Sequence, residues 1–337
     1  MTMDRAAVRI GVLGAARIAP LALVRPAREN PRAAVTAVAA RDLARAEHFA
    51  QRHGIPEAYG DYRALLDDPD VDAVYIPLPN ALHGRWALAA LAAGKHVLCE
   101  KPFTANADEA QKVAAAAHGT GLVVMEAFHY RYHPLAARMK EIVSSGELGT
   151  LRHVAARFCF PLPRFADIRY DYALAGGALM DAGCYAVHMA RLLGGAEPEV
   201  VDAVAKRRTP EVDRAMRATL RFPAGHTGEI RCSMWSADLL AVSARAVGDR
   251  GELRVVNPLA PQAWHRFIVR TAANRRSEHF PRHASYAYQL DAFVRAVRDG
   301  AAVLTPPSDS VANMAVIDSV YTAAGMALRH PGGVPAS

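Results

Sequence analysis

The first part of the chain alternates short, mainly apolar runs with longer segments of helical pattern. The apolar runs are residues 8–13, 34–40, 71–76, 96–100 and 122–125. Their β-branched and aliphatic content predicts strands that are buried on both faces. The helical patterns cover residues 43–52, 82–93 and 107–117. Because strands that alternate with helices form right-handed βαβ units, this part of the chain predicts an α/β domain with a parallel sheet.

In the second part, strand-like runs follow one another with glycine and proline between them. These runs include residues 150–160, 215–222, 227–235 and 241–248. Their spacing predicts antiparallel hairpins. Helical patterns cover residues 134–145, 176–193, 286–298 and 309–328. The length of 337 residues is about twice the ~150 expected of one domain. We therefore expect two domains, residues 1–126 and 127–337, with the break near Glu126.

Composition and charge exclude several classes of protein. Hydrophobic residues make up 52% of the chain, which is ample for ordinary cores and argues against disorder. No apolar run approaches the ~20 residues that cross a bilayer, so we expect no membrane association. The net charge of +7 comes from arginines spread along the chain rather than from a stripe, so nucleic acid is not an expected partner.

Cysteine and histidine positions give no sign of a metal site or of a disulfide framework. The four cysteines have no Cys-x-x-Cys spacing, which is typical of a reducing compartment and predicts a cytoplasmic protein. The fourteen histidines form no metal-ligand cluster. We therefore expect no bound metal.

The turn after the first strand has the features of a dinucleotide site. Such a site needs small residues, so that backbone N–H groups can reach a pyrophosphate at the start of a helix. The three glycine positions of the usual fingerprint are occupied here by Gly14, Ala16 and Ala19. The match is weak by itself, but its place between the first strand and a helix favours cofactor binding.

The residue at the end of the second strand indicates which nicotinamide cofactor is preferred. An acidic residue there binds the ribose 2′-hydroxyl of NAD, whereas an arginine accommodates the 2′-phosphate of NADP. This chain has Arg41 at that place and Arg45 one helical turn later. Asp42 is better interpreted as the N-cap of the next helix. The sequence therefore predicts NADP(H) in preference to NAD(H).

Four motifs in register make the chain resemble the Gfo/Idh/MocA family of oxidoreductases. They are residues 14–19, 79–83, 100–102 (Glu-Lys-Pro) and 177–185, and the resemblance extends from Ile10 to about Met326. Residues 126–134 are similar to a narrower branch, that of NADP-dependent D-xylose dehydrogenases, dimeric dihydrodiol dehydrogenases and sugar ketoreductases.

This resemblance implies a Rossmann domain followed by an α+β domain with a large, mostly antiparallel sheet, on which homodimers or homotetramers are built. It also implies that Lys101 lies beside the nicotinamide. Many family members, inositol dehydrogenases among them, carry histidine where this chain has Tyr185. That difference disfavours inositol oxidation and nominates tyrosine as the acid/base group.

The chemistry expected of these residues is hydride transfer with a Lys/Tyr pair. A tyrosine with the usual pKa of ~10 is a poor base at neutral pH unless a cation lowers that pKa, and Lys101 can supply the cation for Tyr185. Asp181, one helical turn before Tyr185, is expected to bind a sugar hydroxyl or to orient the lysine. His129 and Tyr130 are candidate substrate contacts. The residues expected at the cofactor are Gly14, Ala16, Arg17, Ile18, Arg41, Leu78, Asn80, His83, Glu100 and Lys101.

The leading hypothesis is an NADP(H)-dependent oxidoreductase acting on a small-molecule sugar or polyol alcohol or carbonyl. A trans-dihydrodiol dehydrogenase and a nucleotide-deoxysugar ketoreductase are alternatives within enzymology. An NADP-sensing regulator without turnover is an alternative of another class, against which the presence of both Lys101 and Tyr185 argues. Redox-assisted glycoside cleavage on tightly held NAD is a further option, which Arg41 disfavours.

Overall fold

The computed structural model describes residues 7–332, which divide into two compact units. The first unit contains residues 7–104, Asp108–Tyr132 and Ala284–Ser310. The second contains Ala105–Ala107, His133–His283 and the chain from Val311 onward. The return of residues 284–310 to the first unit is a long-range feature that the local pattern did not predict. The assignment of cofactor binding to residues 1–126, and of substrate binding and oligomerisation to residues 127–337, stays a prediction.

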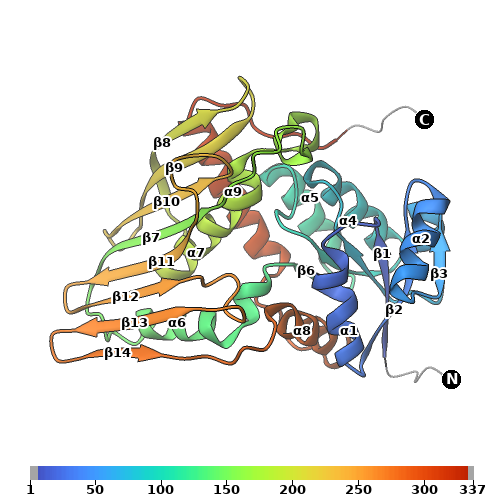
Figure 1. Cartoon of the computed structure of the whole chain (residues 1–337), viewed down its shortest axis with the longest axis horizontal. Coiled ribbons are helices and arrows are strands. Elements are labelled where there is room, and N and C mark those ends of the chain that lie inside the picture. The colour runs from blue at the N-terminus through green and yellow to red at the C-terminus, as the bar shows by residue number, and fades with distance from the viewer. Residues whose placement is uncertain (1–6, 333–337) are drawn as a thin grey trace. The chain divides into compact units, whose positions relative to one another are not determined.

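The first unit is built on a six-stranded parallel sheet with the order β3-β2-β1-β4-β5-β6 (Figure 1). Its strands are β1 (Val8–Leu13), β2 (Ala33–Ala39), β3 (Glu57–Tyr59), β4 (Ala73–Ile76), β5 (His96–Cys99) and β6 (Val124–Glu126). This is the strand order of a Rossmann fold, so the predicted fold class is confirmed for this unit. Only the short β3, which lacks a continuous apolar run, was not predicted.

Helical elements follow each of these strands, and one of them begins at the side-chain cap that the sequence predicted. They are η1 (Pro20–Val24), α1 (Arg25–Glu29), α2 (Leu43–His53), α3 (Tyr62–Leu66), η2 (Asn80–Leu82), α4 (His83–Ala92), α5 (Ala107–Ala117), η3 (His129–Tyr132) and α8 (Ser285–Asp299). The Asp42 carboxylate accepts a hydrogen bond of 3.0 Å from the Ala44 N–H at the start of α2. The predicted N-cap role of Asp42 is therefore confirmed.

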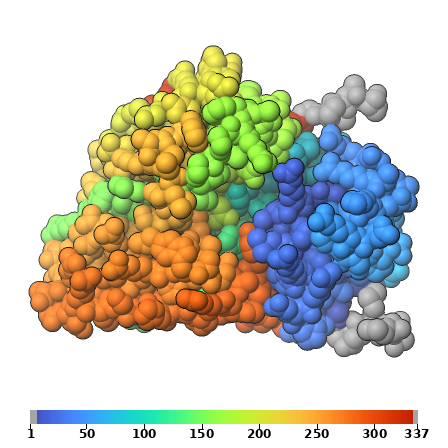
Figure 2. Space-filling view, viewed as in Figure 1, coloured from blue at the N-terminus to red at the C-terminus, as the bar shows by residue number. Residues whose placement is uncertain are grey.

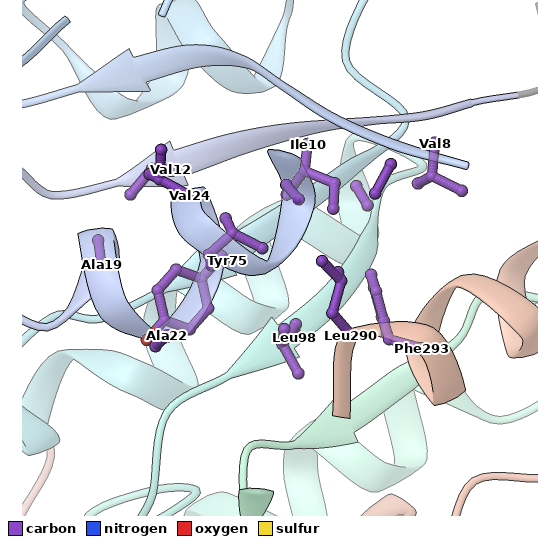
Figure 3. Close-up of a cluster of buried hydrophobic side chains, with 14 of the residues drawn as sticks. Val8, Ile10, Val12, Ala19, Ala22, Val24, Tyr75, Leu98, Leu290 and Phe293 are labelled. Atoms are coloured by element: carbon purple, nitrogen blue, oxygen red, sulfur yellow. The ribbon is translucent and has the colours of Figure 1, made fainter. Parts of the chain in front are cut away.

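Helix α8 packs into the core of the first unit although it lies more than 150 residues after β6 in the sequence. Its Leu290 and Phe293 side chains are buried in the same cluster as Val8 and Ile10 of β1 (Figure 3). Each large apolar side chain contributes about 1.5–3 kcal/mol when it is fully buried. Helix α8 is therefore an integral part of this unit.

The second unit contains an eight-stranded sheet with the order β14-β13-β12-β11-β7-β10-β9-β8. Its strands are β7 (Leu151–Cys159), β8 (Glu199–Arg207), β9 (Asp213–Arg221), β10 (Thr227–Ser233), β11 (Ala241–Gly248), β12 (Gly251–Val256), β13 (Arg266–Thr271) and β14 (Arg275–Glu278). Only β7 and β10 pair in parallel; the other pairs are antiparallel. This confirms the predicted large, mostly antiparallel sheet. Figure 2 shows side chains of the β12–β14 segment, in orange, at the surface of this unit.

The other helical elements are η4, η5, η6, α6, α7 and α9. They span Ile168–Tyr170, Tyr172–Leu174, Leu179–Gly183, Pro134–Ser144, Cys184–Gly194 and Pro307–Ala323, respectively. Two of them differ from the expected bounds. The helix predicted from residue 176 begins with a wide π turn, η6, and the last helix stops before residue 328 because Gly325 adopts a left-handed φ of 62°. No helix within residues 7–332 combines the length and apolar character needed to cross a membrane.

Candidate active site

Gly14 stands directly after β1, at a position where only glycine fits. Its φ is 111°, and a Cβ there would lie 2.8 Å from Cδ2 of Leu78. The Gly14 N–H donates to the Ala39 carbonyl oxygen at 2.8 Å, which ties the turn to the end of β2. Ala16 and Ile18 are half-buried and Arg17 is exposed. The turn therefore presents backbone rather than bulky side chains at the carboxyl end of the sheet, as a pyrophosphate site requires.

Two arginines stand at the end of β2, next to this turn. Arg41 and Arg45 are both exposed, and the Arg45 guanidinium donates to the Ala15 carbonyl oxygen at 3.2 Å. Burial raises the pKa of Tyr62, and the positive charges of Arg41 and Arg45 oppose that shift. This edge of the first unit is therefore cationic, while the carboxylate of Asp42 is engaged as a helix cap.

His83 joins the loops that follow β4 and β5. The ring is buried, with Nε2 2.8 Å from the Leu78 carbonyl oxygen and Nδ1 2.7 Å from that of Pro102. Burial lowers the pKa of His83 to about 4, and the charge of Lys101 acts in the same direction, although the two carbonyl groups oppose it. We regard burial as decisive, so the ring is neutral at pH 7. Both ring nitrogens of His83 face backbone carbonyl groups of the protein. His83 would therefore act on a cofactor site only by holding these two loops in place.

The Glu-Lys-Pro motif follows β5. The Tyr75 hydroxyl donates to Glu100 Oε1 at 2.7 Å, and the Lys101 N–H donates to Glu100 Oε2 at 3.3 Å. Glu100 is 9% exposed and Lys101 is half-buried. Asn80 opens η2 on the neighbouring loop. The contact between Tyr75 and the motif was missed, because nothing in the apolar run of β4 marks one tyrosine as polar.

The two candidate substrate residues of η3 have different surroundings. His129 Nδ1 lies 2.8 Å from Ser285 Oγ, and its ring packs against Tyr286 with centroids 4.1 Å apart. Tyr130 is 0% exposed and packs edge-on against Phe128. The prediction for Tyr130 therefore has the weaker support, because its ring offers no surface to a ligand.

In the second unit, Asp181 and Tyr185 lie on successive turns of η6 and α7. Asp181 Oδ1 is 3.2 Å from the Nε of Arg169, and the negative charge of Asp181 raises the pKa of Arg169. Tyr185 is 5% exposed, with its ring edge-on to Phe158. π turns occur frequently at functional sites. Arg169 was missed because it stands in the three-residue element η4, which is too short to show a pattern.

Lys101 belongs to the first unit, and Asp181 and Tyr185 belong to the second. The Lys/Tyr pairing therefore stays a prediction. Within residues 7–332, no three His, Cys, Asp or Glu side chains are grouped closely enough to hold a metal ion.

The residues at the cofactor turn can be tested for their fit to NADP(H). Only glycine fits at position 14, because a Cβ there would lie 2.8 Å from Leu78 Cδ2. The end of β2 carries two arginines and no uncommitted carboxylate. This donor set suits a dinucleotide with a 2′-phosphate, so the residues fit the cofactor.

Comparison with known proteins shows the family. Residues 8–128 match the model of the oxidoreductase family with an NAD-binding Rossmann fold, and residues 136–254 match the Gfo/Idh/MocA C-terminal domain. The chain is 40% identical over 315 residues to D-xylose 1-dehydrogenase (NADP(+)) 2 of Haloferax volcanii, covering 93% of this chain and 96% of that protein. It is 41% identical over 225 residues to trans-1,2-dihydrobenzene-1,2-diol dehydrogenase of Oryctolagus cuniculus, covering 66% of this chain and 68% of that protein.

A solved structure agrees with these relatives. The chain is similar to a 3-ketoreductase from Actinomadura kijaniata in complex with NADP and TDP-benzene, with a TM-score of 0.87, 34% identity and coverage of 94% and 98% of the two chains. Variants of that ketoreductase with one tyrosine changed to phenylalanine, or one lysine changed to alanine or glutamate, have also been solved. The narrower branch indicated by residues 126–134 is confirmed by these three kinds of relative. The chain belongs to the Gfo/Idh/MocA family of oxidoreductases.

Proposed function

We propose that this protein is an NADP(H)-dependent oxidoreductase that transfers hydride between the nicotinamide and a sugar or polyol. The observation that carries the proposal is the row of residues that follow neighbouring strands of one parallel sheet: Gly14 after β1, Arg41 after β2, Leu78 after β4 and Lys101 after β5. Ligands of open α/β sheets bind at the carboxyl ends of the strands. The names of the relatives, which include NADP and sugar substrates, support the same assignment.

Arg41 and Arg45 would hold the 2′-phosphate of NADP(H), and the turn at Gly14 would hold its pyrophosphate. When bound, the cofactor supplies or accepts the hydride. The chain's own contribution is to orient the reactants and to manage charge and protons, which are the usual tasks of the protein in a nicotinamide enzyme.

In the direction of reduction, the Tyr185 hydroxyl would give its proton to the carbonyl oxygen of the substrate as hydride reaches the carbon. The resulting phenolate would be stabilised by the ammonium group of Lys101 and would regain a proton from solvent. In oxidation, the phenolate takes the alcohol proton. Asp181, held by Arg169 at 3.2 Å, would accept a hydrogen bond from a substrate hydroxyl rather than serve as the acid.

The Tyr185→Phe variant tests this assignment. It should lower kcat by about 10²–10⁴-fold, while the Kd of NADPH, measured by fluorescence titration, stays within about threefold because the phenol contacts the substrate. Lys101→Ala should lower kcat comparably. A Tyr185→Phe variant with wild-type kcat would rule out the role of the tyrosine.

A nucleotide-deoxysugar ketoreductase is the second candidate, favoured by the similarity to the Actinomadura kijaniata enzyme. A panel of D-xylose, a trans-dihydrodiol and a dTDP-linked ketosugar, followed by NADPH absorbance, separates these substrate classes. Wild-type protein that binds NADPH but turns over none of them would support the sensing regulator instead.

We also propose a cellular compartment and an oligomeric state for this protein. The four cysteines are buried thiols, which fits the reducing cytoplasm. Val201 and Val204 on β8 are 46% and 61% exposed, and apolar side chains on an open sheet are suited to contact a second copy. We expect a homodimer or homotetramer, which light scattering after gel filtration would measure.

A further inference from the structure

A buried ion pair lies beneath the start of the helix that carries Asp181 and Tyr185. Asp213, the first residue of β9, and Arg329, which follows α9, are both 0% exposed, and Arg329 Nη2 is 2.9 Å from Asp213 Oδ1. The Tyr321 hydroxyl donates to the same carboxylate oxygen at 2.9 Å. All three residues belong to the second unit. Charges so deeply buried are rare unless they are paired and hydrogen-bonded.

This pair binds the backbone on both sides of one sharp turn. Asp213 Oδ2 accepts from the Leu179 N–H at 2.7 Å, at the first residue of η6. Arg329 Nε donates to the Gly176 carbonyl oxygen at 2.7 Å. Between them, Gly177 has a φ of 138°, and a Cβ there would overlap the Asp213 carboxylate. The carboxylate and the guanidinium therefore fix where the helix begins, two residues before Asp181.

The same turn also holds the segment that carries Arg169, the partner of Asp181. The Gly177 N–H donates to the Arg169 carbonyl oxygen at 2.8 Å, and the Gly176 N–H donates to that of Asp171 at 2.8 Å. Both members of the Arg169–Asp181 ion pair are thus anchored to two adjacent glycines, and Arg329 and Asp213 hold those glycines in place.

A buried ion pair is weak evidence for stability, because desolvation offsets much of the attraction; its best-supported use is to specify geometry. A misplacement of about 1 Å in a catalytic group can lower the rate by about 10²-fold. We propose that Asp213, Arg329 and Tyr321 are positioning residues, which set Asp181 and Tyr185 for hydride transfer through the turn at Gly176 and Gly177. This inference rests on the proposed function of Asp181 and Tyr185.

Two conservative variants test the inference in the full-length protein. Arg329→Lys keeps the charge but loses the forked hydrogen bonds, and Tyr321→Phe removes only one hydroxyl. The matched control is Arg191→Lys, because Arg191 is also buried, at 7% exposed, and pairs with Glu197 at 2.6 Å near the other end of α7. All variants are assayed well below their measured Tm.

We expect Arg329→Lys to lower kcat by about 10- to 100-fold and Tyr321→Phe by about three- to tenfold. The Kd of NADPH should stay within about twofold in both, because the proposed cofactor residues lie in the first unit. Arg191→Lys should keep kcat within about twofold of wild type, even where it lowers Tm to a similar extent.

If Arg329→Lys and Tyr321→Phe lower Tm but keep the kcat of the control, the positioning role is wrong, and the proposed function stands as long as Tyr185→Phe is inactive. If Tyr185→Phe is also active, the proposed function itself fails. If Arg329→Lys does not fold, Tyr321→Phe is the deciding variant. A kcat of Tyr321→Phe within about twofold of wild type would then overturn the inference.

Discussion

Gly14 and Gly54 both adopt positive φ angles, yet their surroundings differ. Gly14 has a φ of 111° and faces Leu78, whereas Gly54 has a φ of 66° after α2, and a Cβ there would meet nothing within 4 Å. An L side chain is strained at either position. Only at Gly14 does a side chain also meet the loop after β4.

Gly14→Ala is therefore predicted to weaken NADPH binding by about tenfold or more and to destabilise the protein by about 1–2 kcal/mol. Fluorescence titration measures the first effect and urea unfolding the second. Gly54→Ala is the matched control: it should cost about 1 kcal/mol and leave the Kd unchanged. Equal Kd values for the two variants would show that the turn at Gly14 is not at the cofactor.

Arg41 is the residue that we expect to discriminate NADP(H) from NAD(H). Charge-assisted hydrogen bonds to a phosphate contribute about 1.5–3 kcal/mol. We predict that Arg41→Ala raises the Kd of NADPH by about 10- to 100-fold and changes the Kd of NADH by less than about threefold, as measured by titration with each cofactor. Arg52→Ala, at the exposed other end of α2, should alter neither value. A parallel loss of NADH affinity would contradict the role in 2′-phosphate recognition.

At the scale of elements, His83 connects the loops after β4 and β5 through contacts of 2.8 and 2.7 Å. A neutral ring can donate to only one of the two carbonyl groups, and the pKa of about 4 keeps the ring neutral. A free imidazole has a pKa near 6.5. The unfolded chain therefore binds a proton between pH 6.5 and about 4 that the folded chain does not bind.

Because the folded-state pKa is lowered, His83 contributes stability that is present above pH ~6.5 and is lost as the pH falls towards ~4. The loss amounts to at most about 3 kcal/mol. Urea unfolding at pH 7, 5.5 and 4.5 should show a shallower pH dependence for His83→Asn than for wild type. His48→Asn, at an exposed position of α2, should match wild type. If the free energy of unfolding depends on pH equally in wild type and in His83→Asn, the ring is not held neutral.

At the scale of the whole molecule, α8 shows how a distant segment completes a unit. Phe293 is 0% exposed in the cluster with β1, whereas Arg295 on the opposite face forms a surface ion pair with Asp291. We predict that Phe293→Ala lowers the free energy of unfolding by about 3–5 kcal/mol. Arg295→Ala should change it by less than about 0.5 kcal/mol. Chemical denaturation of both variants provides the measurement, and a small effect of Phe293→Ala would mean that α8 is only loosely attached.

Local pattern was sufficient for most elements of this fold. Strands buried on both faces, the Asp42 cap and the hairpin spacing are properties of adjacent residues, so five strands of the first sheet and four of the eight strands of the second could be predicted. The elements without a predicted range include β3 (Glu57–Tyr59) and α3 (Tyr62–Leu66), which are too short to show a period, and β8, β12, β13 and β14 of the second sheet. The π turn of η6 was also missed, because a pattern of apolar positions does not distinguish it from an α-helix.

The sequence alone determined the family and the fold class. It also identified the strand-end residues as candidates for the cofactor site, because the spacing of motifs and the order of strands can be read from the sequence. Only the tertiary structure decided which distant groups meet: Arg45 with the Gly14 turn, Arg169 with Asp181, Arg329 with Asp213, and α8 with the first sheet. The reason is physical. The hydrophobic periodicity of a segment depends on residues that are adjacent in the chain. Ion pairs and hydrogen bonds require distances of about 3 Å, and residues far apart in the sequence reach such distances only after the sheets have formed.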